Sequence, residues 1–99
     1  MRVRFEERAK LEFDEARAWY VAIRSELGLL FGAEVRAAGQ RIARMPLMYP
    51  VEMAEIRKCV LTRFPYTLRY ALRNDLVLIV AVSHQHREPS YWIQSPSQG

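Results

Sequence analysis

The chain has 99 residues, of which 51% are hydrophobic and 26% charged, and it carries a net charge of +4. We therefore expect one globular domain over residues 1–99, with 95–99 as a frayed tail. No apolar run approaches the ~20 residues of a membrane span, and nothing resembles a signal peptide, so a cytoplasmic protein with no membrane partner is expected. A lone Cys59 excludes an internal disulfide and a cysteine-based zinc site.

The first elements are a short strand and an amphipathic helix. Val3 and Phe5 alternate with charged residues, which predicts a strand with one buried face. From Ala9 the apolar spacing changes to fours and threes, which predicts a helix with one apolar stripe. That stripe comprises Ala9, Phe13, Ala16, Tyr20, Ile23 and Leu27. Gly28 is expected to end the helix as a left-handed C-terminal residue.

A second helix is predicted to follow at once. Its stripe comprises Phe31, Val35, Ala38, Ile42 and Met45, and Pro46 ends it. Two amphipathic helices joined by so short a connection should lie antiparallel as a helical hairpin. Gly39 costs about 1 kcal/mol against alanine within a helix, so we expect it to permit close packing.

The second half of the chain alternates as strands do. Residues 46–52 contain two prolines and are expected to cross irregularly to a sheet. In the strand predicted from Glu55 to Thr62, one face carries Ile56, Lys58 and Val60, and the other carries Arg57, Cys59 and Leu61. Pro65 cannot donate a ladder hydrogen bond, which places the next turn near residues 62–65.

A β-hairpin is predicted around Asn74-Asp75. Residues 63–73 alternate before this turn and 76–82 are continuously apolar after it, as in a central strand. A two-residue turn would pair Arg73 with Leu76, Tyr70 with Ile79 and Tyr66 with Ser83. His84 would then lie opposite Pro65, beside Arg63. Tyr66 and Tyr70 share one face of the strand and are predicted to be core residues beneath the helices.

Three groups of residues resemble those of one family. They are Ala9…Leu11…Glu15-Ala16…Tyr20 with Leu27-Gly28…Phe31…Glu34-Val35, then Ile56-Arg57-Lys58…Arg63-Phe64-Pro65-Tyr66…Tyr70, then Val82-Ser83-His84…His86-Arg87-Glu88-Pro89…Tyr91-Trp92. Together they resemble the RelE/ParE toxins of bacterial type II toxin–antitoxin systems. The resemblance implies a cytoplasmic toxin neutralised by an antitoxin encoded beside it, in a toxin–antitoxin hetero-oligomer. It also implies an α+β fold in the order β-α-α-β-β-β, a helical hairpin packed on a small antiparallel meander, which agrees with the elements predicted above.

The family divides by target. RelE-like members cleave mRNA on the ribosome without a metal, and ParE-like members inhibit DNA gyrase. RelE-like members use basic residues and a tyrosine on the sheet and the C-terminal segment for this cleavage. The positions here that match those residues are Arg57 or Lys58, Arg63, Arg87 and Tyr91. The Phe64-Pro65-Tyr66 motif and the C-terminal H-x-x-R-x-P-x-Y-W pattern resemble the ParE-like branch. We therefore place gyrase inhibition slightly ahead of mRNA cleavage; a degenerate member that only binds its antitoxin is the third alternative.

Candidate site residues follow from these alternatives. RNA cleavage needs groups that hold phosphate charge, for which arginine suits, and groups that move protons, for which histidine suits neutral pH best. His84 and His86 lie two apart, but no third ligand is apparent, so neither a metal site nor a cofactor is expected. The candidate catalytic residues are Arg63, Arg87, Tyr91, Lys58 and His84. The candidate target- or RNA-binding residues are Arg57, Lys58, Arg69, Arg73, His86 and Trp92. The candidate antitoxin-binding residues are Trp19, Arg57 and Arg69.

Overall fold

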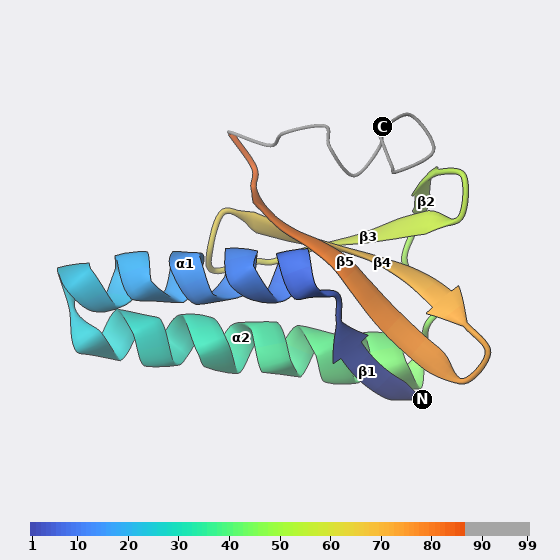
Figure 1. Ribbon diagram of the computed structural model, residues 1–99, viewed down its shortest axis with the longest axis horizontal. Helices are drawn as coiled ribbons and strands as arrows, with labels where there is room; N and C mark the ends of the chain where they lie inside the picture. The colour runs from blue at the N-terminus through green and yellow to red at the C-terminus, as the bar shows by residue number, and fades with distance from the viewer. Residues whose placement is uncertain (87–99) are drawn as a thin grey trace.

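A helical hairpin covers one face of a five-stranded sheet (Figure 1). The computed structural model describes residues 1–86. The elements are β1 (Arg2–Phe5), α1 (Glu7–Ile23), α2 (Ser25–Arg44), β2 (Val51–Met53), β3 (Ile56–Val60), β4 (Tyr66–Arg73) and β5 (Leu76–His84). The α+β class and the predicted order of helices and strands are confirmed, with β2 as an addition. No helix among residues 1–86 is both long and apolar enough to cross a membrane.

The two helices run antiparallel and meet at a single residue. Arg24 lies between them in an extended conformation, with φ −165° and ψ 130°. The prediction that the first helix runs to Leu27 and ends at Gly28 is wrong, because Gly28 lies inside α2. Ile23, predicted to belong to the buried stripe, is 60% exposed at the tip of the hairpin.

Gly28 is required by packing and not by backbone conformation. A Cβ atom built on Gly28 would lie 2.2 Å from Val21 Cγ2 on α1, closer than real atoms approach. A Cβ on Gly39 would meet Val3 Cγ1 at 3.8 Å, an ordinary contact. The close approach predicted at Gly39 is therefore found at Gly28, where α1 and α2 cross.

The sheet has the strand order β1-β5-β4-β3-β2. Strands β3, β4 and β5 form the predicted antiparallel meander, and β1 adds to β5 in parallel. Strand β5 is therefore an interior strand, as its continuous apolar sequence predicted.

Strand β2 replaces part of the expected irregular crossing. Val51–Met53 pairs with β3 through a tight hairpin in which Met53 faces Ile56. Ala54 takes a left-handed φ of 50° in this turn. Glycine and asparagine are the usual residues in that conformation, so the sequence carried no turn signal there.

The β4–β5 hairpin turns at Asn74-Asp75, as predicted, but its register shifts along the way. Arg73 faces Leu76 and Tyr70 faces Ile79. A bulge at Val80 then makes Arg69 face Ala81, so that Tyr66 faces His84 and not Ser83. His84 consequently does not oppose Pro65; the N–H of Gln85 bonds to Pro65 O at 2.7 Å instead.

An aromatic core joins the two layers. Phe31 of α2 has its ring centroid 5.3 Å from that of Tyr20, 5.3 Å from Phe64 and 5.1 Å from Tyr66. Tyr66 and Tyr70 are 7% and 0% exposed, which confirms them as core residues. The pairs of Phe31 with Phe64 and Tyr66 are edge-to-face and add to the stabilisation from burial, so the start of β4 is firmly held against the helices.

Candidate functional site

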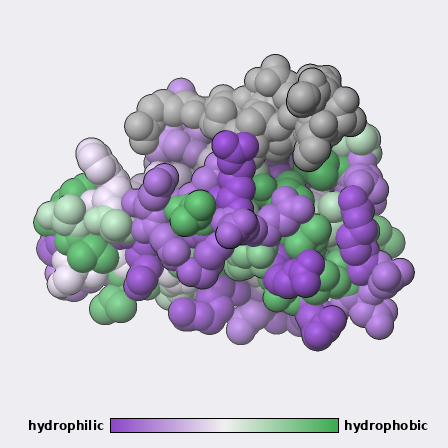
Figure 2. All heavy atoms as spheres, viewed as in Figure 1, coloured by the Kyte–Doolittle hydropathy of each residue, from purple (hydrophilic) through white to green (hydrophobic). Residues whose placement is uncertain are grey.

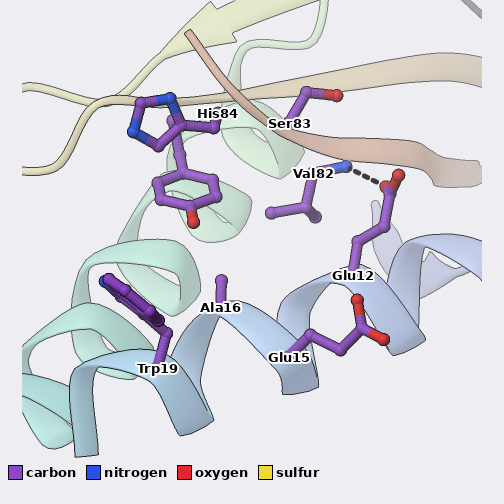
Figure 3. A pocket seen from close by; sticks show the side chains of 8 residues that line it. Glu12, Glu15, Ala16, Trp19, Val82, Ser83 and His84 are labelled. Carbon is purple, nitrogen blue, oxygen red and sulfur yellow. Dashed lines mark hydrogen bonds between the residues drawn. The ribbon is translucent and has the colours of Figure 1, made fainter. Parts of the chain in front are cut away.

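A hollow of about 320 Å³ opens between α1 and the end of β5 (Figure 3). Its walls are Glu12, Glu15, Ala16, Trp19, Tyr66, Val82, Ser83 and His84. Glu12 crosses the gap and accepts a hydrogen bond from the N–H of Val82 at 2.8 Å. The Ser83 side chain points away from α1, as expected for its place on the other face of β5 (Figure 3). The hollow therefore has an acidic helix on one wall and the His84 end of the sheet on the other.

His84 lies at the rim of this hollow. Its ring meets that of Tyr66 edge-on, with centroids 5.2 Å apart. Its Nδ1 accepts a hydrogen bond from the N–H of His86 at 3.1 Å. His86 itself is exposed.

The turn from β3 to β4, residues 61–65, is fixed at several points. Leu61 and Phe64 are buried at 3% and 9% exposure, and the N–H of Leu61 bonds to Tyr66 O at 2.9 Å. Glu34 Oε2 on α2 accepts three hydrogen bonds from the turn: from Thr62 N at 2.9 Å, Arg63 N at 3.0 Å and Thr62 Oγ1 at 3.2 Å. The backbone at Arg63 is therefore tied to the helix layer, while its side chain is exposed.

Opposite charges meet on the sheet face that points away from the helices. The Glu52 carboxylate of β2 forms ion pairs with Arg69 Nε at 2.7 Å and with Lys58 Nζ at 3.8 Å. The hydrogen bond from Arg69 holds the pKa of the Glu52 carboxyl below its usual value. Arg73 pairs in the same way with Glu55. Three basic side chains of β3 and β4 are thus paired with two glutamates from the β2–β3 hairpin.

Arg57 lies on the helix side of β3. Its guanidinium donates to Tyr49 O at 2.7 Å and Leu47 O at 3.3 Å, in the connection between α2 and β2. Tyr70 Oη donates to Pro46 O at 2.6 Å in the same connection, and burial raises the pKa of Tyr70 to about 12. These contacts give Arg57 a structural role, holding the chain where it leaves α2.

Cys59 lies in the same buried region. It is 1% exposed, and burial is the main reason that the pKa of its thiol is raised. Because burial raises the pKa of this thiol, the thiol stays protonated and unreactive, as expected for a small core residue. Nearby, Arg41 Nε donates a hydrogen bond to Tyr49 Oη at 3.4 Å, and this bond raises the pKa of Arg41.

The structure separates the predicted catalytic residues. Lys58 faces Arg69 on the sheet face away from the helices, whereas His84 faces Tyr66 on the helix side. Arg63 lies at the same end of the sheet as His84, because Gln85 bonds to Pro65. Three of the candidates, Arg87, Tyr91 and Trp92, lie outside the described residues. Within residues 1–86, no three histidine, cysteine or acidic side chains are grouped as metal ligands would be.

Sequence reasoning missed three acidic residues. Glu52 pairs with Arg69 and Glu55 pairs with Arg73. Glu34, which appeared only as part of the family motif, binds the backbone of the turn at Thr62 and Arg63. The two prolines of residues 46–52 predicted an irregular chain where β2 carries Glu52. The sequence offers one signal for Glu52 and Glu55: residues 51–57 can form two short strands joined by a two-residue turn.

Exposed apolar side chains gather at the tip of the helical hairpin (Figure 2). Leu29 is 71% exposed, Ile23 60% and Trp19, one turn earlier on α1, 63%. Contiguous exposed apolar surface of this kind marks interaction sites in soluble proteins. The tip and the acidic hollow are adjacent, because Trp19 belongs to both.

A family model matches this sequence, and a solved structure shares its fold. The sequence model described as "ParE toxin of type II toxin-antitoxin system, parDE" matches residues 3–89. Among solved structures, a chain of the "Chromosomal ParDE TA system from P. aeruginosa" superposes with a TM-score of 0.67 at 15% identity, covering 85% of this chain and 95% of that chain. At this identity the superposition shows a shared fold. A search of curated proteins found no match.

Proposed function

Because the chain belongs to the ParE toxin family of type II toxin–antitoxin systems, we propose that this toxin acts by binding and inhibiting a DNA gyrase-type target. We further propose that a cognate antitoxin neutralises it in a toxin–antitoxin complex. The observation that carries the first proposal is the separation of Lys58 from His84 by the thickness of the sheet.

Metal-independent cleavage of RNA needs a base for the 2′-hydroxyl, a cation for the phosphorane charge and an acid for the leaving oxygen. These groups must converge within hydrogen-bonding reach of one phosphate. Lys58 is paired with Glu52 on the far face, and Arg57 is held by two backbone carbonyls. This arrangement favours inhibition by binding, which needs surface complementarity and no proton transfer.

Ribosome-dependent mRNA cleavage remains the second candidate, supported by one observation. Arg63 and His84 lie at the same end of the sheet, and together they could supply a phosphate-binding cation and a proton carrier. The third candidate is a protein that only binds its antitoxin. In that case neither gyrase nor the ribosome should be inhibited.

The antitoxin is expected to cover the apolar tip of the hairpin and Trp19. Of the three residues predicted to bind it, Trp19 is 63% exposed, whereas the Arg69 side chain is 3% exposed and Arg57 is bound to carbonyls. A partner helix or strand that buries Trp19 would remove this surface from water, which is the main source of favourable free energy in such interfaces.

One experiment separates the alternatives. Toxin is purified with its antitoxin, released, and added in parallel to gyrase supercoiling reactions and to ribosomes translating a defined mRNA. We expect supercoiling to be inhibited and the mRNA to stay intact. Discrete mRNA cuts that disappear with Arg63→Ala but persist with Arg36→Ala, an exposed arginine of α2, would overturn the proposal in favour of cleavage.

A further inference from the structure

We propose that Glu34 is a positioning residue that presents Arg63 to the target, where the guanidinium binds a carboxylate on the target protein. The inference rests on the proposed inhibition by binding and adds the residues that carry it. Three observations and the chemistry of the guanidinium group lead to it.

The first observation is that Arg63 differs from the other basic residues of β3, β4 and the turn between them. Lys58 and Arg69 are paired with Glu52, Arg73 is paired with Glu55, and Arg57 donates to carbonyls. Within residues 1–86, the exposed side chain of Arg63 forms no ion pair and no hydrogen bond. Among the basic residues from Arg57 to Arg73, it is thus the one cation that the described part of the chain leaves available to a partner.

The second observation is that the backbone beneath this free side chain is unusually well fixed. Leu61 and Phe64 anchor the turn on either side in the core, and the N–H of Tyr66 bonds to Phe64 O at 2.7 Å. Pro65 O accepts the N–H of Gln85 at 2.7 Å. Exposed turns are commonly mobile, and immobilising one adds nothing to a surface arginine that has no partner.

The third observation is the convergence on Glu34. One carboxylate oxygen receives two successive backbone N–H groups and a hydroxyl, at 2.9–3.2 Å. Successive N–H groups of this kind form a concavity that favours an anion, and here a side chain of α2 fills it. Glu34 therefore sets the conformation of Thr62 and Arg63, and with it the direction in which the guanidinium leaves the surface.

The chemistry of the guanidinium group indicates the kind of group that it would bind. A guanidinium held at its base binds a carboxylate through two parallel N–H···O bonds with little further loss of conformational entropy. Because the proposed inhibition is by binding to a protein, the group that the guanidinium binds is a carboxylate of that protein. A phosphate of the bound DNA offers similar geometry, and the experiment separates the two.

The test is a double-mutant cycle on wild-type toxin, Glu34→Ala, Arg63→Ala and the double variant. Its readouts are growth arrest on induction, which does not depend on the identity of the target, and the concentration that halves gyrase supercoiling. Each single variant should weaken inhibition about tenfold, the size expected for one lost charge-assisted contact. Glu34→Ala should add less than about twofold in the Arg63→Ala background, because its effect passes through Arg63.

Controls separate positioning from stability. Glu26→Ala removes an exposed carboxylate of the same helix and should leave inhibition unchanged. Antitoxin binding and thermal unfolding of each variant report the folded fraction. Glu34→Gln keeps an acceptor oxygen and should recover part of the loss. If the two single losses multiply in the double variant, or if Glu34→Ala inhibits as wild type does, the inference is overturned.

The remaining outcomes are also decisive. If wild-type toxin arrests growth but does not inhibit gyrase, the proposed function fails, while the cycle measured on growth arrest still tests the role of Glu34. Binding of toxin to gyrase without DNA tests the partner. An Arg63 effect in that assay supports a protein carboxylate, and an effect seen only with DNA present overturns it in favour of a phosphate.

Discussion

Tyr70 shows how one buried side chain ties the sheet to the end of the helix layer. Its ring is 0% exposed and its hydroxyl donates to Pro46 O at 2.6 Å, just after α2. Burial raises its pKa to about 12, from an unfolded value of about 10. The folded state therefore keeps this proton to higher pH than the unfolded state does.

The direction of the pH dependence is set by this raised pKa. The stabilisation from the neutral phenol is complete below pH 10 and is lost as the pH rises from about 10 to about 12, by about 2 kcal/mol. Tyr70→Phe should lower the free energy of unfolding by about 1 kcal/mol at pH 7, through loss of the hydrogen bond. It should also flatten the decline above pH 10.

Urea unfolding at several pH values measures both effects for Tyr70→Phe. Tyr49→Phe is the matched control, because it retains Tyr70 and should therefore retain the alkaline decline. An equal decline above pH 10 in wild type and Tyr70→Phe would show that the buried phenol is not its source.

At the scale of elements, the crossing of α1 and α2 depends on Gly28 and Val21. A methyl group at position 28 would meet Val21 Cγ2 at 2.2 Å, so the Val21 side chain would have to move, and a β-branched side chain has few alternative rotamers in a helix. We expect Gly28→Ala alone to destabilise the protein by about 1 kcal/mol, despite the better helix propensity of alanine.

The same substitution should have the opposite effect once Val21 is shortened. In a Val21→Ala background, the methyl group added by Gly28→Ala no longer meets Val21 Cγ2. The substitution then gains about 1 kcal/mol of helix propensity. Thermal or urea unfolding of the four proteins measures this change of sign. A destabilisation of equal size in both backgrounds would place the strain elsewhere than at Val21.

The sequence predicted those elements whose apolar spacing is regular. The stripes of both helices, the alternation of β4 and the Asn74-Asp75 turn determined the fold class and the core positions of Tyr66 and Tyr70. The bulge at Val80 could not be predicted, because residues 76–82 are apolar throughout and a shift of one residue leaves no mark in such a strand. The helix boundary at Arg24 was missed because it has neither glycine nor proline.

The site was less predictable than the fold for a related reason. The residues on β3 and β4 were placed on the correct faces, yet the partners that neutralise them lie outside that segment. Glu52 reaches the Arg69 side chain from 17 positions away, and Glu34 accepts the backbone N–H of Arg63 from 29 positions away. Such contacts follow from tertiary packing, so the number of basic residues on β3 and β4 overstates how many of them remain unpaired.

At the scale of the whole molecule, protection should fall from the centre of the sheet to its β2 edge. Strand β4 is buried along Tyr66–Ala71 and flanked by strands on both sides, whereas all three residues of β2 are exposed. Amides of β4 should exchange with solvent only through global unfolding. Amides of β2 should exchange by local opening, at least about 100-fold faster.

Hydrogen exchange on wild type and Gly28→Ala tests whether residues 1–86 unfold as one unit. If α1, α2 and the sheet are one cooperative domain, a loss of about 1 kcal/mol at the helix crossing should speed exchange in β4 about fivefold, although Gly28 lies on another element. Exchange in β2 should not change, because local opening does not pass through the helix crossing. A response confined to α1 and α2 would mean that the helical hairpin opens independently of the sheet. In that case Glu34 could not hold the Arg63 turn in a fixed direction, because the α2 carboxylate and the turn would belong to separately mobile units.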